Sequence, residues 1–242
     1  MKLRFLGTRG EIEARSQRHR RHSVLHVSHG GRALLVDCGR DWLGQLPRVA
    51  AEALLLTHAH PDHAGGLRGG CPWPVYATEE AWAALRRYPL DPRLLVTPGE
   101  GVRAAGMRVD AVPVEHSLRA PAVAYRIAAG RTTIIYAPDV AALPARGEAL
   151  SGIDLYVGDG AAVIRSILRR RDGHPIGHAS IKAQLDWCAD CGVPQAVFTH
   201  CGSEILRDEA DAATRIEGLA RERAMRAEIA YDGLELVVRA SR

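Results

Sequence analysis

The chain has 242 residues, of which 47% are hydrophobic and 25% are charged. This balance is typical of a soluble globular protein, and the length suits one domain, residues 1–242, with a substantial core. No apolar run approaches membrane-spanning length, so we expect no membrane segment. The formal net charge of +4 does not by itself indicate a nucleic-acid-binding protein. The first apolar segment is too short for a secretory signal, which favours a cytoplasmic location.

Alternation of apolar and polar residues predicts strands in the first part of the chain. Residues 1–7 are typical of a strand, and residues 23–28 and 33–38 form a hairpin pattern around a Gly-Gly turn. Between them, residues 8–22 are polar and rich in arginine. They are either a solvated loop or a loop that contacts an anionic substrate.

Two groups of potential metal ligands look structural. Four histidines lack clustered ligand spacing, and we expect them at the surface or at a sheet edge: His19, His22, His26 and His29. Cys188 and Cys191 form a C-x-x-C inside a predicted helix without a second pair, which favours a half-buried helical face over a zinc or redox site. The five cysteines are an odd number at irregular spacing, so we expect no disulfide framework.

Metal-ligating side chains cluster after the apolar residues 53–56, which predict a buried strand. His58 and His60 are two residues apart, so they point the same way in an extended segment. Asp62 and His63 come just after the strand, where a loop can aim them at a second point. Imidazole and carboxylate groups are ligands that divalent metals take. One short loop can therefore serve two ions.

Further predicted strands also end at potential ligands. Strand-like segments end at His116, at Asp139 and at His200, and the second of these follows a hairpin predicted within residues 123–137. Another strand ends just before Asp159. Loops at strand ends commonly carry functional side chains, so the recurrence favours one shared site over isolated structural residues.

Caps and periodicity predict three helices. Thr78 is a candidate N-cap for residues 79–87, with glutamates in the first turn and arginines in the last. Ser180 is a candidate N-cap for residues 181–191. Residues 204–224 have the pattern of an amphipathic helix, whose apolar face would pack on the domain or on a second subunit. A homodimer is therefore one of two alternatives.

The order of the candidate ligands closely resembles the seven-ligand set of dinuclear metallo-β-lactamase-fold hydrolases, whose signature is H-x-H-x-D-H. The resemblance covers nearly the whole chain and implies an α/β fold, a four-layer αββα sandwich of two mixed β-sheets flanked by helices. It implies two divalent ions, for which Zn²⁺, Mn²⁺ and Fe²⁺ are all suitable. One ion would be bound by His58, His60 and His116, the other by Asp62, His63 and His200, with Asp139 as the bridge.

The charges of such a site favour hydrolysis of an anionic ester. Two divalent ions, two carboxylates and a bridging hydroxide leave about one positive charge, and the ions lower the pKa of the bridging water. Asp62 can orient this hydroxide. The leaving oxygen also needs a proton. Gly177-His178-Ala179-Ser180 resembles the G-H-[ST]-[ST] motif of the phosphodiesterase branch, which supplies a general-acid histidine. Asp159 stands where that branch has a glutamate to orient it, although an ordinary turn residue is the alternative.

The spacing within the chain narrows the substrate. The tRNase Z members of that branch have a long tRNA-gripping arm between the residues that correspond to His116 and Asp139, whereas only 22 residues separate them here. This argues against tRNA and favours a small cyclic or nucleotide-like phosphodiester. The arginines between Asp159 and His178 either hold a phosphate or form a solvated helix end: Arg165, Arg169, Arg170 and Arg171.

Two alternative classes of function are kept. The same scaffold can hydrolyse a non-phosphate ester, a thioester or a lactone, or serve cofactor biosynthesis, and these branches do not need a histidine like His178. A protein that binds metal or nucleic acid without catalysis is the third hypothesis, and the complete ligand set argues against it.

Overall fold

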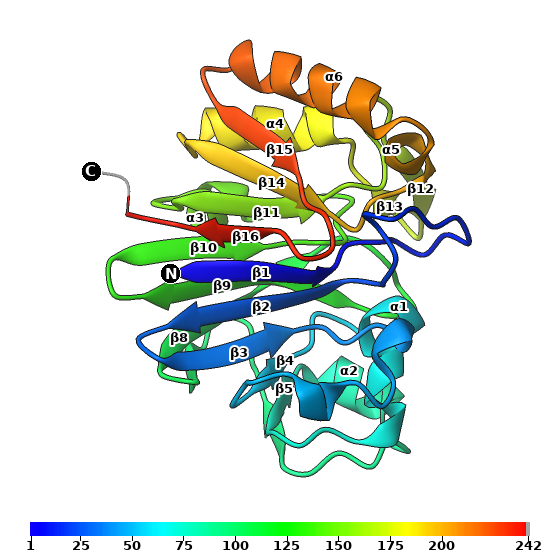
Figure 1. The fold of residues 1–242 in the computed structure, drawn as a ribbon, viewed down its shortest axis with the longest axis vertical. Coiled ribbons are helices and arrows are strands. Elements are labelled where there is room, and N and C mark those ends of the chain that lie inside the picture. Colours follow the sequence, from blue (N-terminus) through cyan, green and yellow to red (C-terminus); the bar gives the residue numbers. More distant parts are fainter. Residues whose placement is uncertain (241–242) are drawn as a thin grey trace.

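Two seven-stranded mixed sheets form the centre of the computed structural model, which describes residues 1–240 (Figure 1). The first sheet has, in spatial order, the strands β16 (Glu235–Val237), β1 (Lys2–Gly7), β2 (Val24–His29), β3 (Arg32–Val36), β4 (Leu54–Leu55), β5 (Val75–Ala77) and β6 (Arg93–Leu95). Its pairings are antiparallel from β16 to β3 and parallel from β3 to β6. The predicted N-terminal strand and the first hairpin are therefore confirmed.

The second sheet repeats this arrangement. Its strands, in spatial order, are β15 (Arg226–Ile229), β14 (Gln195–Thr199), β11 (Leu155–Asp159), β10 (Thr132–Tyr136), β9 (Ala122–Ala129), β8 (Met107–Val114) and β7 (Val102–Ala104). The pairings are antiparallel from β7 to β10 and parallel from β10 to β15. The predicted hairpin before Asp139 is β9–β10.

Helices cover the outer faces of both sheets (Figure 1). The first sheet is covered by α1 (Pro61–Ala64), α2 (Glu79–Ala84) and the short 3-10 turns η1 (Arg40–Trp42), η2 (Leu46–Arg48) and η3 (Gly65–Gly69). The second sheet is covered by α3 (Arg146–Leu150), α4 (Ile181–Asp190), α5 (Ser203–Arg207) and α6 (Glu209–Arg221). No helix within residues 1–240 is long and apolar enough to cross a membrane.

Three apolar clusters separate the four layers, which confirms the αββα sandwich. Phe5 and Tyr125 lie between the two sheets, and Ile135 packs with α4 and α6 outside the second sheet. Along β4, Leu55 faces the other sheet whereas Leu54 packs against the helical layer. Both faces of this strand are buried, which explains its continuous apolar sequence.

The predicted helices are present with different ends. Thr78 Oγ1 accepts a hydrogen bond from the Ala81 N–H, and Ser180 Oγ accepts one from the Ala183 N–H, so both predicted N-caps are confirmed. The helix after Thr78 ends at Ala84 rather than at residue 87. The segment 204–224 is two helices, because Asp208 leaves helical geometry and caps α6. The α6 helix packs on α4 and β15 of its own chain.

A separate hairpin, β12 (Ile167–Arg171) and β13 (His174–His178), projects beside α5 and carries the arginine run (Figure 1). The prediction of a solvated helix end for this run was wrong. Two adjacent apolar residues, Ile167 and Leu168, followed by three arginines give no apolar helical stripe. Gly173, at φ 84°, closes a tight turn that favours strands.

Candidate metal centre and acid–base pair

The candidate site lies where five strands end. Strands β8, β10, β11 and β14 run in the same direction, so their carboxyl ends lie at one edge of the second sheet, and β4 of the first sheet ends against them. Asp159 is the last residue of β11, and the loops and the short helix that follow the strands carry the other residues predicted from the sequence: His58, His60, Asp62, His63, His116, Asp139 and His200. The structure therefore brings every sequence-predicted site residue to one place, with His178 added from the end of β13.

The first group, here called the three-histidine group, consists of His58, His60 and His116. His58 Nε2 and His60 Nδ1 are 2.9 Å apart, and His116 Nε2 is 3.3 Å from the same His60 nitrogen. The group's ring nitrogens and a carboxylate oxygen of Asp139 lie within 4.8 Å of one another. The His116 Nδ1–H can donate to the Gly177 carbonyl oxygen at 3.1 Å, which turns Nε2 toward the cluster.

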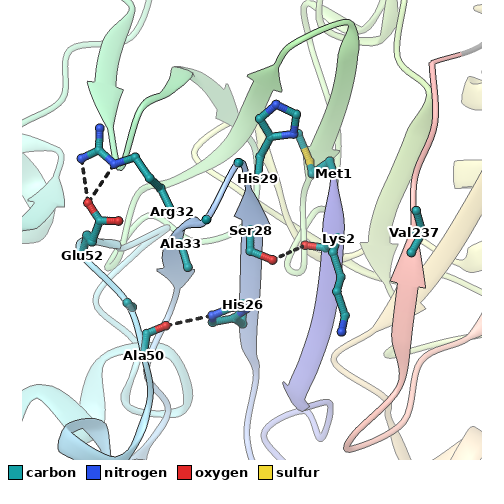
Figure 2. A pocket seen from close by; sticks show the side chains of 13 residues that line it. Met1, Lys2, His26, Ser28, His29, Arg32, Ala33, Ala50, Glu52 and Val237 are labelled. Carbon is teal, nitrogen blue, oxygen red and sulfur yellow. Dashed lines mark hydrogen bonds and ion pairs between the residues drawn. The ribbon is translucent and has the colours of Figure 1, made fainter.

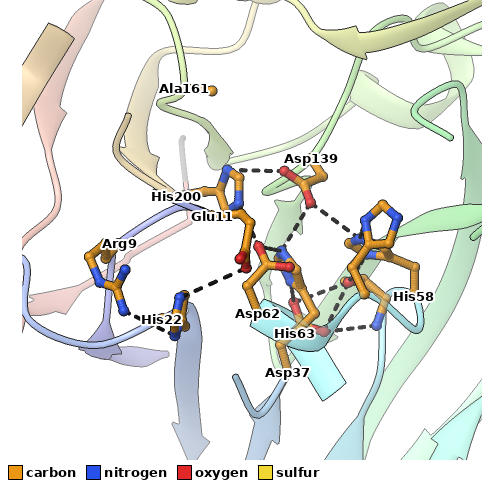
Figure 3. A network of polar contacts seen from close by, with 12 residues as sticks. Arg9, Glu11, His22, Asp37, His58, Asp62, His63, Asp139, Ala161 and His200 are labelled. Atoms are coloured by element: carbon orange, nitrogen blue, oxygen red, sulfur yellow. Dashed lines mark hydrogen bonds and ion pairs between the residues drawn. The ribbon is translucent and has the colours of Figure 1, made fainter. Parts of the chain in front are cut away.

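The second group, here called the Asp62 group, consists of Asp62, His63 and His200. His200 Nε2 lies 3.0 Å from Asp62 Oδ2, and His63 Nε2 lies 3.3 Å from the same oxygen. Asp139 is shared by the two groups: its Oδ2 is 3.2 Å from His58 Nε2 and 2.9 Å from His63 Nε2, and its Oδ1 is 3.0 Å from His200 Nδ1 (Figure 3).

The donor set fits two divalent cations. Within residues 1–240, three buried atoms at the centre of the cluster lack a partner in hydrogen-bond geometry: His63 Nε2, Asp139 Oδ1 and His200 Nδ1. Buried polar atoms are otherwise paired in folded proteins, so converging unpaired imidazole and carboxylate atoms indicate a cation. The backbone of His200 is left-handed, at φ 54°. Such a conformation costs about 1 kcal/mol and is typical of functional sites.

A buried residue that the sequence interpretation missed holds the cluster from behind. Asp37, at the end of β3, has a left-handed backbone at φ 64° and is fully buried. Its Oδ2 accepts from His63 Nδ1–H at 2.8 Å, and its Oδ1 accepts from the N–H and the hydroxyl of Thr57. These contacts fix the His63 ring with Nε2 toward the cluster. The only sequence signal was a carboxylate directly after a buried strand.

The arginine-rich segment 8–22 is partly buried, against one expectation. His19 and His22 were predicted at the surface or at a sheet edge, but both are buried. Asp41 explains the burial of His22, because its carboxylate accepts from the His22 backbone N–H at 3.0 Å and from the Arg9 guanidinium at 2.7 Å. The same guanidinium lies 3.2 Å from His22 Nδ1 (Figure 3). These partners could not be predicted from sequence patterns, because Asp41 follows the hairpin that comes after His22 in the chain. The contacts of Arg9 and His22 with Asp41 therefore hold this segment beside the site, and it is not a fully solvated loop.

The electrostatics differ between the two groups. Burial lowers the pKa of His58 well below its ordinary value, and it also lowers the pKa of His60. Burial opposes the charged form of His63 and His200 as well, but the surrounding carboxylates outweigh it and raise the pKa of both rings well above the ordinary value. The Asp62 group therefore lies in the more negative potential and attracts positive charge more strongly.

His178 and Asp159 form a pair next to the cluster. Asp159 Oδ2 accepts from His178 Nδ1–H at 2.7 Å, and the His178 ring stacks on His200 at 5.5 Å between ring centres. Asp159 is fully buried and also accepts from the backbone N–H groups of Val140 and Ala161. It is the last residue of β11, and its contact with the Ala161 N–H is typical of a turn residue. Asp159 therefore both supports the turn after β11 and orients His178. Burial opposes the charged form of His178, but Asp159 outweighs it and raises the pKa of His178.

The cluster opens into a cavity of about 690 Å³. His60, Asp62, His116, Asp139, His178 and His200 lie in its wall. The remaining wall comes from residues 10–12, η1, the start of α5 and the segment 161–167. The cavity is large enough for a small organic molecule beside the cluster.

Another cavity, of about 630 Å³, lies far from the cluster around the N-terminus and the β2–β3 turn (Figure 2). Several of its polar groups are paired with each other. His26 Nε2 lies 3.0 Å from the Ala50 carbonyl oxygen, and the Arg32 guanidinium donates to Glu52 at 2.7 and 2.9 Å. Nothing in this second cavity resembles a catalytic arrangement.

Comparison with known proteins identifies the family. The family model described as "Beta-lactamase superfamily domain" matches residues 32–201, more than half of the chain. The chain is 28% identical over 212 residues to an octanoyltransferase of Porphyromonas gingivalis, covering 78% of this chain and 40% of that protein. It is 27% identical over 195 residues to a ribonuclease Z of Bradyrhizobium diazoefficiens, covering 66% of this chain and 62% of that protein. The chain thus spans less than two thirds of either curated relative.

Solved structures share the fold over nearly the whole chain. Zn²⁺-bound PqqB from Methylobacterium extorquens matches with a TM-score of 0.77 and 20% identity, covering 98% of this chain and all of that one. A diphosphatase of the PhnP family matches with a TM-score of 0.70 and 22% identity, covering 97% and 96%. The fold and the site define the class, a protein of metallo-β-lactamase fold with a cluster of candidate metal ligands. The chain belongs to the β-lactamase superfamily.

Proposed function

We propose that this protein is a hydrolase that binds two divalent ions and cleaves small phosphodiesters, with His178 as the general acid. One observation carries the proposal: the His178–Asp159 pair, at 2.7 Å, lies directly beside two ligand groups that share Asp139. Phosphodiester cleavage needs both a charge-stabilising centre and a proton for the leaving oxygen. The site provides candidates for both.

The ligand groups would hold the ions and the substrate's phosphoryl group. The three-histidine group and the Asp62 group would bind one ion each, Zn²⁺ or Mn²⁺ with Fe²⁺ as a further candidate, and Asp139 would bridge them. The bound ions would polarise the phosphoryl oxygens and activate water at neutral pH. Asp62 lies in the cavity wall, where its carboxylate can accept a hydrogen bond from the attacking water and orient it.

His178 would donate the proton. Its Nδ1–H is held by Asp159, so Nε2 is the nitrogen left for the substrate, and the side chain is 22% exposed and lies in the cavity wall. A protonated ring held by a buried carboxylate can donate to the leaving oxygen and take its next proton from water. Asp159 acts through His178 and is a positioning residue.

The geometry around the cavity favours a small substrate. The 22 residues between His116 and Asp139 are occupied by a short loop and the β9–β10 hairpin, which is fully paired inside the second sheet. This connection forms no arm that could grip a folded nucleic acid. Ribonuclease Z relatives and a PhnP-family diphosphatase support phosphate-ester chemistry, and the cavity size supports a cyclic or nucleotide-like diester.

The acid role predicts a dependence on the leaving group. With Mn²⁺ or Zn²⁺ added, we expect His178→Ala to lose about 10²–10⁴-fold in kcat with a 2′,3′-cyclic nucleotide, whose leaving alkoxide needs a proton. The loss should be much smaller with bis(4-nitrophenyl) phosphate, because nitrophenolate leaves without one. The matched control is His174→Ala. It removes an exposed histidine from the same hairpin as His178, where it pairs with Glu115.

Two results would contradict the proposal. If no divalent metal supports turnover of a phosphodiester, the proposed reaction is wrong. If His178→Ala loses the same factor in kcat with both substrates, His178 is not the general acid. A panel of thioesters and lactones tests the alternative, since unchanged turnover of one of them by His178→Ala would favour a non-phosphate hydrolase or a cofactor-biosynthesis enzyme.

A further inference from the structure

Arg165 is a cation without a partner in the wall of the catalytic cavity. Within residues 1–240, its guanidinium has no hydrogen bond or ion pair, and the side chain is exposed to the cavity. It follows β11 and precedes β12, so it belongs to the segment that connects Asp159 to the hairpin of His178. A free guanidinium beside an ester-hydrolysing centre can bind an anionic group of the substrate.

The other charged groups of the cavity wall are already engaged. Arg40 donates to both oxygens of Glu11, at 2.5 and 2.6 Å, so this pair is nearly neutral. Glu204 pairs with Arg215 at 3.0 Å and accepts from the Val163 N–H at 2.9 Å. Among the described residues of the wall, Arg165 is thus the guanidinium whose charge no carboxylate compensates.

The backbone around Arg165 is fixed although its side chain is free. On one side, the Val163 N–H donates to Glu204, and the Val163 carbonyl oxygen accepts from the Lys182 N–H at 3.0 Å. On the other side, Ser166 Oγ accepts from the Ser180 N–H at 2.8 Å. These contacts hold the segment on the N-terminus of α4. A cation on a fixed backbone loses less freedom when it binds, which favours a specific contact.

The cavity wall beside Arg165 is apolar. Ala161, Ala162 and Ile167 line it there, and Ile12 lines it as well. An apolar wall that ends in one free guanidinium suits an organic group that carries an anion. The ions and His178 would hold the scissile phosphate in the same cavity.

We propose that Arg165 selects substrates with a second anionic group, so that the preferred substrate is a phosphodiester whose organic part carries a further phosphate or carboxylate. This inference rests on the proposed phosphodiesterase function and narrows its substrate class. Arg165 makes an ion pair with the second anion and does not touch the reacting phosphate. It is therefore a specificity residue.

The test uses a matched pair of substrates: thymidine 5′-(4-nitrophenyl phosphate) and the same compound with a 3′-phosphate. The wild-type protein should prefer the phosphorylated substrate by about tenfold in kcat/KM, the size expected for one charge-assisted contact at a partly exposed site. Arg165→Ala should bring this ratio close to one, mainly through KM, and Arg165→Lys should keep part of it. The control Arg169→Ala removes an exposed arginine on β12, outside the cavity wall, and should keep the wild-type ratio.

Equilibrium binding separates this inference from the proposed function. The affinities for thymidine 3′,5′-bisphosphate and thymidine 5′-monophosphate, measured by calorimetry, give the same ratio without turnover. A binding preference that Arg165→Ala removes supports the role of Arg165 even if no diester is cleaved, in which case only the proposed function fails. Turnover by a wild-type protein without any preference, or a preference that survives Arg165→Ala, overturns the inference alone.

Discussion

The two ligand groups meet at Asp139 but have different surroundings. The three-histidine group is oriented by neutral atoms, such as the Gly177 carbonyl oxygen that accepts from His116. The Asp62 group includes one carboxylate and has a second, Asp37, directly behind His63. Negative charge next to a cation site strengthens binding, and a carboxylate behind an imidazole raises the basicity of that imidazole.

This difference indicates unequal ion sites. An ion at the Asp62 group would meet two carboxylates, Asp62 and Asp139, and an imidazole supported by Asp37. An ion at the three-histidine group would meet neutral rings and share only Asp139. We therefore expect the Asp62 group to hold its ion more tightly and the three-histidine group to exchange its ion more readily.

The largest effect is expected from Asp139→Asn, which removes the negative charge that the two groups share. Both ion sites should weaken, and turnover of bis(4-nitrophenyl) phosphate should fall by more than the roughly 10–100-fold that outer ligands typically cost. Elemental analysis after dialysis measures the metal content, and circular dichroism shows whether the variant is folded. Together they separate ion loss from unfolding. A variant that kept two ions and near-normal turnover would show that the groups do not depend on Asp139.

A smaller effect that distinguishes the groups is expected from Asp37→Asn. Asn keeps the size of the side chain but removes the charge behind His63, so affinity for the tighter ion should fall by roughly 10–100-fold. Titration with Zn²⁺ against a competing chelator measures the two affinities separately. The control is Asp110→Asn, which removes a surface carboxylate that pairs with Arg108. Equal weakening of both ions by Asp37→Asn would contradict the comparison.

The smallest effect concerns His22 and the stability of the fold. It is absent at neutral pH. Burial, with the nearby Arg9, lowers the pKa of His22 to about 4, against 6.5 for an unperturbed histidine. Between these values the unfolded chain binds more protons than the folded one, so stability falls as the pH drops from 6.5 to 4. The slope contributed by His22 is at most about 1.4 kcal/mol per pH unit.

Denaturant unfolding at several pH values tests this behaviour. In His22→Asn, the free energy of unfolding should lose less than in the wild-type protein between pH 6.5 and pH 4, because the titrating ring is gone. His29→Asn, on the exposed β2–β3 turn, should keep the wild-type slope. An unchanged slope in His22→Asn would mean that His22 is charged in the folded protein.

Most of the fold elements were predictable because their signals are local. Alternation in residues 1–7 and the apolar run at residues 53–56 follow directly from which faces are buried. Caps such as Thr78 and Ser180 need only a neighbour three residues away. One error was local, because the tight turn at Gly173 favours the hairpin that carries the arginine run. The others depended on distant partners, as in the burial of His19 and His22.

The candidate site divides in the same way. The types and order of its side chains, from His58 to His200, are properties of the sequence, because each one follows a strand that its own apolar pattern predicts. The resemblance to the phosphodiesterase branch also suggested His178 and Asp159, but the 2.7 Å contact between them joins the ends of two strands, which only folding brings together.

The sequence by itself therefore determined which side chains could bind metal and that they stand at strand ends, because strand periodicity and ligand chemistry are local properties. Only the tertiary structure decided that Asp37 supports His63, that His22 is buried against Asp41, and that Arg165 has no partner among residues 1–240. These features depend on contacts between segments far apart in the chain. Burial and pairing, which set the charge of a side chain, arise only after the two sheets have packed.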